Sequence, residues 1–279
     1  MSANVNAVNP KALSDNVPIN KLFSDLFGFH KDHIVCCIIG MKGSGKTYLT
    51  TKMLRNEGLD YDSLYIFSPS IDQPKYQYLI HGLNSQLSNE ELAILYEDEN
   101  SYYISPAKKI EKIARNRIVH PVDALIYPAL PRVCYAYSNI DDLDALTDSS
   151  LILSKFSKNI FVFDDILGIN TKGQRKITSY ITRGRHFNCS VFFLTQNYSE
   201  ISTSIKKNTD IFIFFLPFPK SDRIYFYTYY INNLFKDFHE FNSFINENLK
   251  NRYYFVIFMP SSMNKTIILG NEFLNLLPL

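Results

Sequence analysis

The sequence predicts an α/β fold with a mostly parallel central sheet flanked by helices. Short apolar runs rich in β-branched and aromatic residues recur along the chain, which is typical of buried strands. Segments with a helical pattern separate several of these runs, and parallel strands need such crossover connections. The chain has 279 residues, 46% of them hydrophobic, which is enough for one large α/β domain or for a domain with a large insertion.

The chain divides into an arm, a main domain and an insertion. Residues 1–30 are expected to form an N-terminal arm, because their first part is polar and rich in asparagine. Residues 31–279 are expected to form the main domain, with an insertion at about 71–130. Within the insertion, 89–97 has the capping box of a helix, and 108–117 is basic with a helical pattern. The basic run could contact nucleic acid, but a solvated helix face is the favoured interpretation.

Outside the insertion, strands and helices alternate for most of the chain. Apolar runs bounded by turn residues predict the strands, and helical periodicity predicts the connecting helices. Residues 219–249 are expected to form two aromatic-rich helices. The predicted strands cover residues 33–39, 63–67, 133–137, 159–163, 189–194, 210–216, 252–259 and 265–269, the last two as a pair, and the predicted helices cover 48–56, 141–156 and 171–182.

A glycine-rich loop follows the first predicted strand. Residues 40–47 read GMKGSGKT and fit the pattern G-x-x-x-x-G-K-[ST] of the phosphate-binding loop, or P-loop. Its glycines let the backbone N–H groups point at phosphate oxygens, and the helix that follows adds its positive N-terminus. Lys46 supplies a positive charge to the β- and γ-phosphates, and the hydroxyl of Thr47 can ligate Mg²⁺. The expected ATP-binding residues are Gly40, Gly43, Ser44, Gly45, Lys46, Thr47 and Tyr48.

The context of this loop decides between a phosphate site and a chance match. A signature with four fixed positions can coincide by accident in a long chain. Here a buried strand precedes the loop and a helix follows it, which is the setting that the chemistry requires. The sequence therefore predicts P-loop chemistry with ATP and Mg²⁺ as cofactors.

The strand predicted at 159–163 runs directly into two carboxylates. We expect Asp164 to hold Mg²⁺, which is the Walker B role, and Asp165 to orient and activate the attacking water. A hydrophobic strand that ends in two aspartates is, on its own, usually a turn into a loop. The phosphate loop upstream favours the catalytic interpretation.

The spacing of the two motifs predicts the type of sheet. The stretch between Lys46 and Asp164 leaves room for at least one intervening strand–helix unit. Such a sheet is typical of P-loop NTPases of the additional-strand motor type, in which a third strand carries a polar residue that senses the γ-phosphate. Gln196 ends the strand after Asp164 and fits that role. An ordinary polar residue at a strand end is the alternative.

Two arginines, Arg183 and Arg185, lie at the end of the helix that follows the carboxylates. A guanidinium group stabilises charge on a transferring phosphoryl group, so either arginine could act as a finger across a subunit boundary. We expect both near one edge of the nucleotide site, although a surface ion pair or a DNA contact is also open. Arg183 shares a helical face with Lys172, Arg175 and Lys176, and that face could line a DNA channel or meet water.

Composition narrows the classes of function. The net charge is +2, so any DNA contact must come from local patches. The four cysteines lack zinc-type spacing and the six histidines form no ligand pair, so buried reduced thiols are expected instead of a metal site. The N-terminus is polar, unlike a secretory signal, and no apolar run is long enough to predict a membrane span.

These motifs together resemble a known family, the poxvirus-type genome-packaging ATPases of the FtsK–HerA superfamily, which occur in large DNA viruses, virophages and Polinton-like elements. The likeness covers about residues 33–70 and 155–216. It rests on residues 40–47, the strand into Asp164-Asp165, the run Gly184-Arg185-His186-x-Asn188 and the run Leu194-x-Gln196-x-Tyr198.

The resemblance implies an ATPase that translocates double-stranded DNA into a preformed capsid. It implies a homo-oligomeric ring, a pentamer or a hexamer, that contacts DNA and a viral capsid vertex or capsid protein. The implied location is the host cytoplasm or virus factory, or the virion. Many superfamily members have Asp-Glu where this chain has Asp164-Asp165, although the viral branch also has Asp-Asp. The low net charge leaves the DNA path open.

Two other classes of function are weighed against this one. The first is a cellular or plasmid FtsK–HerA-like DNA pump or a helicase-loader ATPase. The second is a small-molecule kinase or GTPase, which is disfavoured because the chain has no N-K-x-D guanine motif. DNA-stimulated ATP turnover would separate the DNA motors from the kinase, and a capsid partner would separate the packaging motor from other pumps.

Overall fold

The structure is a computed structural model that describes residues 33–54, 59, 61–85, 132–143, 157–166, 171–184, 188–215, 219–232, 235–248, 255–259, 266–270 and 276–277. The predicted arm, the helix candidates at 89–97 and 108–117, most of the helix predicted at 141–156, and Arg185 lie outside these residues.

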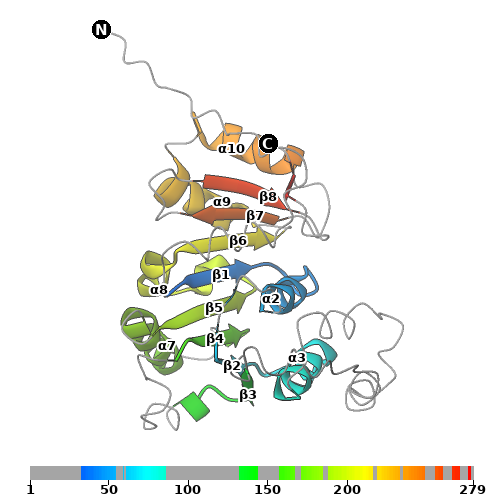
Figure 1. Cartoon of the computed structure of the whole chain (residues 1–279). Coiled ribbons are helices and arrows are strands. Elements are labelled where there is room, and N and C mark those ends of the chain that lie inside the picture. Colours follow the sequence, from blue (N-terminus) through cyan, green and yellow to red (C-terminus); the bar gives the residue numbers. More distant parts are fainter. Residues whose placement is uncertain are drawn as a thin grey trace.

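A single sheet of nine strands forms the centre of the part that the structure describes (Figure 1). Its strands are β1 Val35–Ile39, β2 Ser63–Phe67, β3 Val133–Tyr137, β4 Asn159–Asp164, β5 Cys189–Thr195, β6 Ile211–Phe215, β7 Phe255–Met259, β8 Thr266–Gly270 and β9 Leu276–Leu277. They lie in the order β3-β2-β4-β5-β1-β6-β7-β8-β9. Pairing is parallel from β3 to β6 and antiparallel from β6 to β9, which confirms the mostly parallel sheet.

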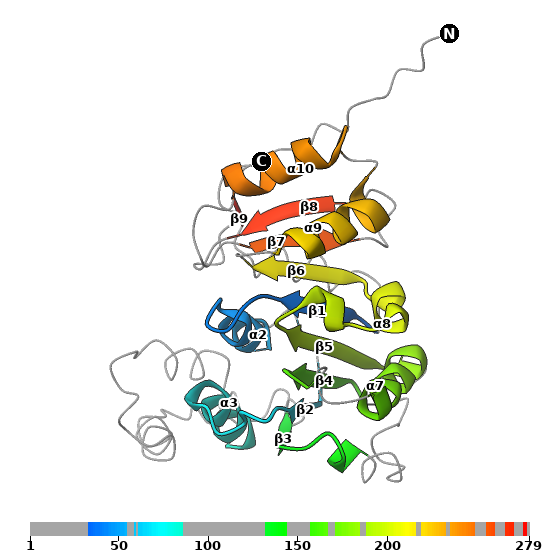
Figure 2. The ribbon, with the colours of Figure 1, turned by 180° about the vertical axis from the view of Figure 1, so that it is seen from behind.

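Helices cover both faces of this sheet (Figures 1 and 2). Alternate residues of β1 point to opposite faces, and all five are buried. One face packs on α2 and α3, and the other packs on α7, α8, α9 and α10. The helices are α2 Lys46–Leu54, α3 Pro74–Asn84, α7 Thr171–Gly184, α8 Thr203–Asn208, α9 Lys220–Phe226, which continues as a π-helical turn over Tyr227–Ile231, and α10 Phe238–Asn248.

Stacked aromatic rings lock the register of the strands. Tyr65 of β2 stacks on Tyr135 of β3 and on Phe161 of β4, with ring centroids 5.0 and 4.9 Å apart. A second row joins Phe67 to Tyr137 at 4.8 Å and to Phe163 at 5.3 Å. Such cross-strand pairs each stabilise a sheet by up to about 1 kcal/mol, and a one-residue slip would break all of them at once. The two rows of stacked rings therefore fix how β2, β3 and β4 are aligned with one another along the sheet.

The structure adds two helices that were not predicted. Helix α3 occupies the beginning of the segment that was predicted as an insertion at 71–130. Pro74 stands at its start, where proline is favoured, and its buried side chains face α2 and β3. Helix α8 is capped by Ser202, whose side chain accepts a hydrogen bond from the N–H of Ile205 at 3.3 Å. The two aromatic-rich helices and the final antiparallel strand pair are confirmed.

The four cysteines form no disulfide with one another, and all four are buried, as expected. Burial raises the pKa of Cys37 to about 12, so this thiol stays protonated near neutral pH. Within the described ranges, no helix combines the length and the apolar character that crossing a membrane requires.

Candidate nucleotide site

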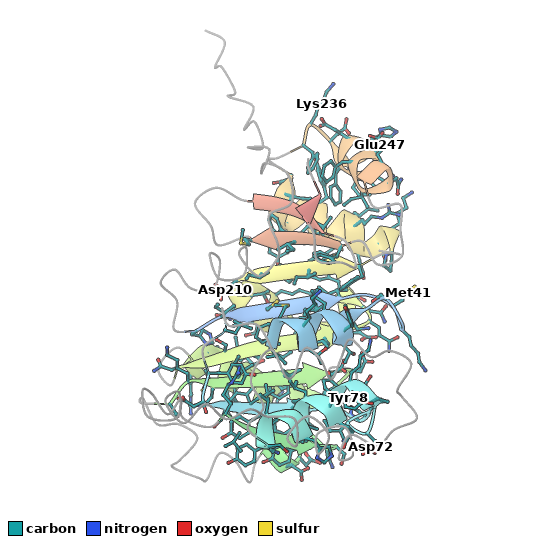
Figure 3. The ribbon with its side chains drawn as sticks, turned by 45° about the vertical axis from the view of Figure 1, so that its right-hand side comes forward. Met41, Asp72, Tyr78, Asp210, Lys236 and Glu247 are labelled. Carbon is teal, nitrogen blue, oxygen red and sulfur yellow. The ribbon has the colours of Figure 1, made fainter. Side chains whose placement is uncertain are left out.

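Topology brings three sequence motifs to one edge of the sheet. β4, β5 and β1 are neighbours and run parallel, so their carboxyl ends lie side by side. β4 ends at Asp164, β5 is followed by Gln196, and β1 leads into the loop at residues 40–47. Figure 3 shows Met41 of this loop at the edge opposite Asp210, which precedes β6. The predicted third strand is therefore β5, which lies between the loop strand and the carboxylate strand.

The loop at residues 40–47 wraps tightly and is fixed to β5. Gly43 and Gly45 have φ of 73° and 105°, a backbone conformation that favours glycine. The N–H of Gly40 donates to the carbonyl of Thr195 at 3.1 Å, and the N–H of Ser44 donates to the carbonyl of Met41 at 3.1 Å. Helix α2 begins at Lys46, so its N-terminal N–H groups open onto the loop.

Gly40 is needed for close packing of this loop. A Cβ at Gly40 would lie 2.6 Å from the Oγ of Ser44 and 2.7 Å from the Cβ of Phe215. Phe215 is buried in β6, so its Cβ cannot move without moving the strand.

We expect Gly40→Ala to lower the free energy of unfolding by about 1–3 kcal/mol, the range for overpacking of a core. It should also weaken nucleotide binding, because the inserted methyl group displaces Ser44. Urea unfolding with and without ATP measures both effects. An unchanged unfolding midpoint together with unchanged ATP stabilisation would show that the loop relaxes freely.

Lys46 and Ser44 present polar atoms toward the inside of the loop. The Nζ of Lys46 donates to the carbonyls of Gly40 at 2.6 Å and Met41 at 3.3 Å, and an ammonium group has a third donor for a phosphate oxygen. Burial lowers the pKa of Lys46, and the nearby carboxylates of Asp165 and Asp164 oppose this shift. The Oγ of Ser44 is buried and has no hydrogen-bond partner among the described residues. A bound phosphate group would supply that partner.

Asp164 is a buried carboxylate at the end of β4, with 4% of its surface exposed. Burial raises its pKa to about 6, and the hydrogen bond from the hydroxyl of Tyr76 acts in the opposite direction. That bond is 2.7 Å long and ends on the Oδ2 of Asp164. The hydroxyl of Thr47 also lies close enough to lower this pKa by hydrogen bonding. The side-chain oxygens of Asp164 and Thr47 thus lie together and could both serve as ligands to a metal ion.

Asp165 and Gln196 form a second pair at the same edge. Asp165 has φ of 53°, which is uncommon for a residue other than glycine, and its N–H donates to the carbonyl of Leu194 at 2.9 Å. The Nε2 of Gln196 donates to the Oδ2 of Asp165 at 3.2 Å, and both side chains are exposed. The backbone turn therefore aims the Asp165 carboxylate away from the core and toward Gln196.

The loop after β5 is braced on both sides of Gln196. Glu200 accepts hydrogen bonds from the side chains of Asn197 at 2.7 Å and Thr195 at 3.5 Å. The Oδ2 of the buried Asp222, on α9, accepts from the N–H of Tyr198 at 3.1 Å. These contacts limit the backbone movements available to Gln196.

The donor set suits a magnesium ion held together with a nucleotide. No cluster of three or more His, Cys, Asp or Glu side chains that could hold a metal occurs within the described ranges. Mg²⁺ does not need one, because it is usually held by one or two protein oxygens, several waters and the substrate phosphates. Thr47 and Asp164 fit that pattern, and the Oγ of Ser44, which has no partner among the described residues, suits a phosphate oxygen.

Comparison with known proteins rests on structure, since no protein-family model and no curated protein matches this sequence. The genome-packaging NTPase B204 of Sulfolobus turreted icosahedral virus 2, solved with ATP-γS, has a TM-score of 0.50 at 14% identity. The match covers 85% of this chain and 98% of that one. VirB4 of Thermoanaerobacter pseudethanolicus also has a TM-score of 0.50, at 12% identity over 85% of this chain and 90% of that one. This is the fold of the P-loop ATPases.

In this P-loop fold, Arg183 lies away from the candidate nucleotide site of the same chain. Helix α7 returns from the carboxylate edge to the start of β5. A Cβ at its last residue, Gly184, would lie 2.7 Å from the ring of His33 and 2.9 Å from the carbonyl of Cys189. Both neighbours stand at the amino edge of the sheet. The expectation that both arginines lie near the site is therefore wrong for Arg183 within a single chain, its role as a finger from a neighbouring chain stays a prediction, and Arg185 lies outside the described residues.

The basic face predicted on α7 is only partly described. Arg175 and Arg183 are exposed, which suits either DNA or water. The side chains of Lys172 and Lys176 lie outside the described part of the structure.

Sequence reasoning missed Tyr76, which contacts Asp164, and it missed Glu200 and Asp222, which brace the loop after β5. Tyr76 belongs to the segment that was predicted as an insertion, although its spacing to Leu79 and Leu83 is that of a buried helix face. Glu200 follows Gln196 closely and lies in a short 3₁₀ turn. Asp222 opens an aromatic-rich helix and carried no local signal.

Proposed function

We propose that this chain is an ATP-driven motor that moves double-stranded DNA into a preformed capsid. The observation that carries the proposal is the convergence of the phosphate loop, the Asp164–Asp165 pair and Gln196 at adjacent strand ends. The motif resemblance to genome-packaging ATPases supports it. The likeness of the fold to a packaging NTPase, which covers 85% of this chain and 98% of that one, supports it as well.

In this proposal each residue at the edge has a separate task. The loop N–H groups, Ser44 and Lys46 bind the phosphates of ATP. Thr47 and Asp164 would hold Mg²⁺, which would supply positive charge to the phosphates of the nucleotide. Asp165 orients the attacking water and accepts its proton. Gln196, held against Asp165, is placed to respond to the γ-phosphate.

A finger arginine in this proposal must come from a neighbouring subunit if it is Arg183. This residue lies at the amino edge of the sheet, away from its own loop. A ring of identical subunits, a pentamer or a hexamer, could bring that edge of one subunit to the nucleotide of the next. Arg185 is the other candidate for the same task, and the sequence slightly favours it over Arg183.

The alternative function is a DNA pump that does not serve a capsid. VirB4 reaches the same TM-score as the packaging NTPase, and its fold covers the same share of this chain. A small-molecule kinase is less well supported, because neither of these two solved structures is a kinase.

The test is ATP hydrolysis by the purified chain with Mg²⁺, with and without double-stranded DNA. We expect linear DNA of any sequence to stimulate ATP turnover. We also expect the chain to bind empty capsids of the virus that encodes it, at their vertices. Turnover that DNA leaves unchanged would contradict the motor. DNA-stimulated turnover without capsid binding would favour the alternative pump.

The DNA path can be tested through salt dependence. Each B-DNA phosphate contact contributes about −0.9 to the slope of log affinity against log salt concentration. If α7 lines the path, replacing Lys172, Arg175 and Lys176 with glutamine should flatten that slope by up to about 2.7. The matched control replaces the exposed Lys207, Lys220 and Lys236, which changes the net charge equally. An equal slope in both triple variants would place the path elsewhere, with residues 108–117 as the next candidate.

A further inference from the structure

Tyr76 is a buried phenol that the proposed chemistry does not yet use. It lies in the first turn of α3 and is fully buried. Its hydroxyl donates to the Oδ2 of Asp164 at 2.7 Å, so it spends its donor on the carboxylate proposed to hold Mg²⁺. A buried tyrosine hydroxyl normally finds a partner, but a backbone carbonyl would serve that purpose as well. Burial alone therefore does not explain why the hydroxyl of Tyr76 donates to Asp164, the proposed metal ligand.

The contact restricts the orientation of Asp164. A carboxylate attached by one bond can turn about its Cβ–Cγ bond, and this broad torsion has no strong preference of its own. A directional hydrogen bond from Tyr76 to Oδ2, together with the nearby hydroxyl of Thr47, limits that freedom and presents the carboxylate in one orientation to a metal. Metal ligands are commonly oriented by such outer partners, and removal of the partner weakens metal binding.

We propose that Tyr76 is a positioning residue that fixes Asp164 for Mg²⁺. This inference rests on the proposed function, since it assigns a partner to the metal ligand of that same site. It also ties the metal to α3, the helix that begins the long connection between β2 and β3 and packs against both α2 and β3. A displacement of α3 would therefore reach the metal through a single hydrogen bond.

The test compares Tyr76→Phe with Tyr61→Phe. Both variants remove a buried hydroxyl that donates a 2.7 Å hydrogen bond, but the partner of Tyr61 is the carbonyl of Leu54 at the end of α2. The measurement is binding of a fluorescent ATP analogue during titration with Mg²⁺ and, separately, with Ca²⁺. Mg²⁺ demands near-ideal octahedral geometry, whereas Ca²⁺ tolerates variable geometry, so a loss of positioning should affect Mg²⁺ more.

We expect Tyr76→Phe to weaken apparent Mg²⁺ affinity about fivefold to tenfold, which is what one net hydrogen bond corresponds to. Ca²⁺ affinity and metal-free binding of the analogue should stay near wild type, and Tyr61→Phe should leave all three unchanged. Steady-state turnover should show the same loss as a higher Mg²⁺ requirement, with kcat largely restored at saturating Mg²⁺.

Three results would overturn the inference. Mg²⁺ affinity equal to wild type in Tyr76→Phe would mean that the bond does not position the ligand. An equal loss for Mg²⁺, Ca²⁺ and metal-free binding would mean that the phenol only supports the fold, and thermal unfolding of both variants checks this. Wild-type protein that binds the analogue without any effect of Mg²⁺ would overturn the proposed function as well, and this outcome is seen before any variant is made.

Discussion

Lys46→Ala is expected to abolish ATP turnover and to weaken ATP binding. The ammonium group of Lys46 is buried within the loop and lies near both Asp164 and Asp165. Its removal leaves the charge that develops on the γ-phosphate without its fixed cation. Loss of one preorganised donor of this kind lowers turnover by about 10²–10³-fold, and loss of a full charge should do at least as much.

The measurement is steady-state ATPase activity together with binding of a fluorescent ATP analogue. Lys220→Ala, at the exposed start of α9, is the matched control for loss of one lysine. Lys46 also donates to two loop carbonyls, so thermal unfolding should verify that the variant remains folded. Turnover within a few fold of wild type would contradict the phosphate-loop assignment.

Asp165→Asn is expected to separate binding from hydrolysis. Asparagine is well tolerated at positive φ, so the turn at 53° should persist. The amide oxygen can still accept from Gln196, which keeps the local hydrogen bond. The variant loses only the negative charge that would activate water, and a positioned general base contributes about 10²–10⁴-fold to rate.

We therefore expect ATP and Mg²⁺ to bind Asp165→Asn as they bind wild type, while hydrolysis falls by about 100-fold or more. Asp72→Asn is the control, because Asp72 is also exposed and lies in the loop that follows β2 (Figure 3). Hydrolysis at the normal rate would assign the water-activating task to another group.

Much of this architecture could be read from the sequence, for a physical reason. Strands of a parallel sheet are buried on both faces, so β1 and residues 160–163 of β4 stand out as unbroken apolar runs. The loop at residues 40–47 is recognisable because tight wrapping around phosphate requires glycines at fixed positions. These constraints act on consecutive residues, so they can be recognised in a short stretch of sequence.

The remaining features depend on contacts between distant parts of the chain. Tyr76 and Asp164 lie 88 residues apart in sequence, and neither neighbourhood indicates the other. The order β4-β5-β1, which puts Gln196 between the two motifs, is a property of the sheet and not of any segment.

The place of Arg183 is different, because it could have been anticipated. A helix that joins two parallel strands must run back along the sheet, so its last residues lie at the edge where the next strand starts. Helix α7 follows this rule, and it puts Arg183 beside the beginning of β5. The expectation from the sequence was based on the short distance in sequence between Arg183 and Asp165. It did not take into account that α7 runs away from the carboxylate edge of the sheet.

The pairing of β5 on both sides has a mechanical consequence. Each of its residues faces β4 or β1 in a fixed register, and the carbonyl of its last residue, Thr195, also holds Gly40. Because β5 is paired on both sides, it cannot slide relative to its neighbours when nucleotide binds. The central sheet is therefore expected to move as a rigid unit. Outside the sheet, the Oδ2 of Asp222 accepts a hydrogen bond from the N–H of Tyr198 and so links the loop after β5 to α9. If the chain is the motor proposed above, this loop and α9 are where a nucleotide-dependent movement near Gln196 would first reach the rest of the molecule.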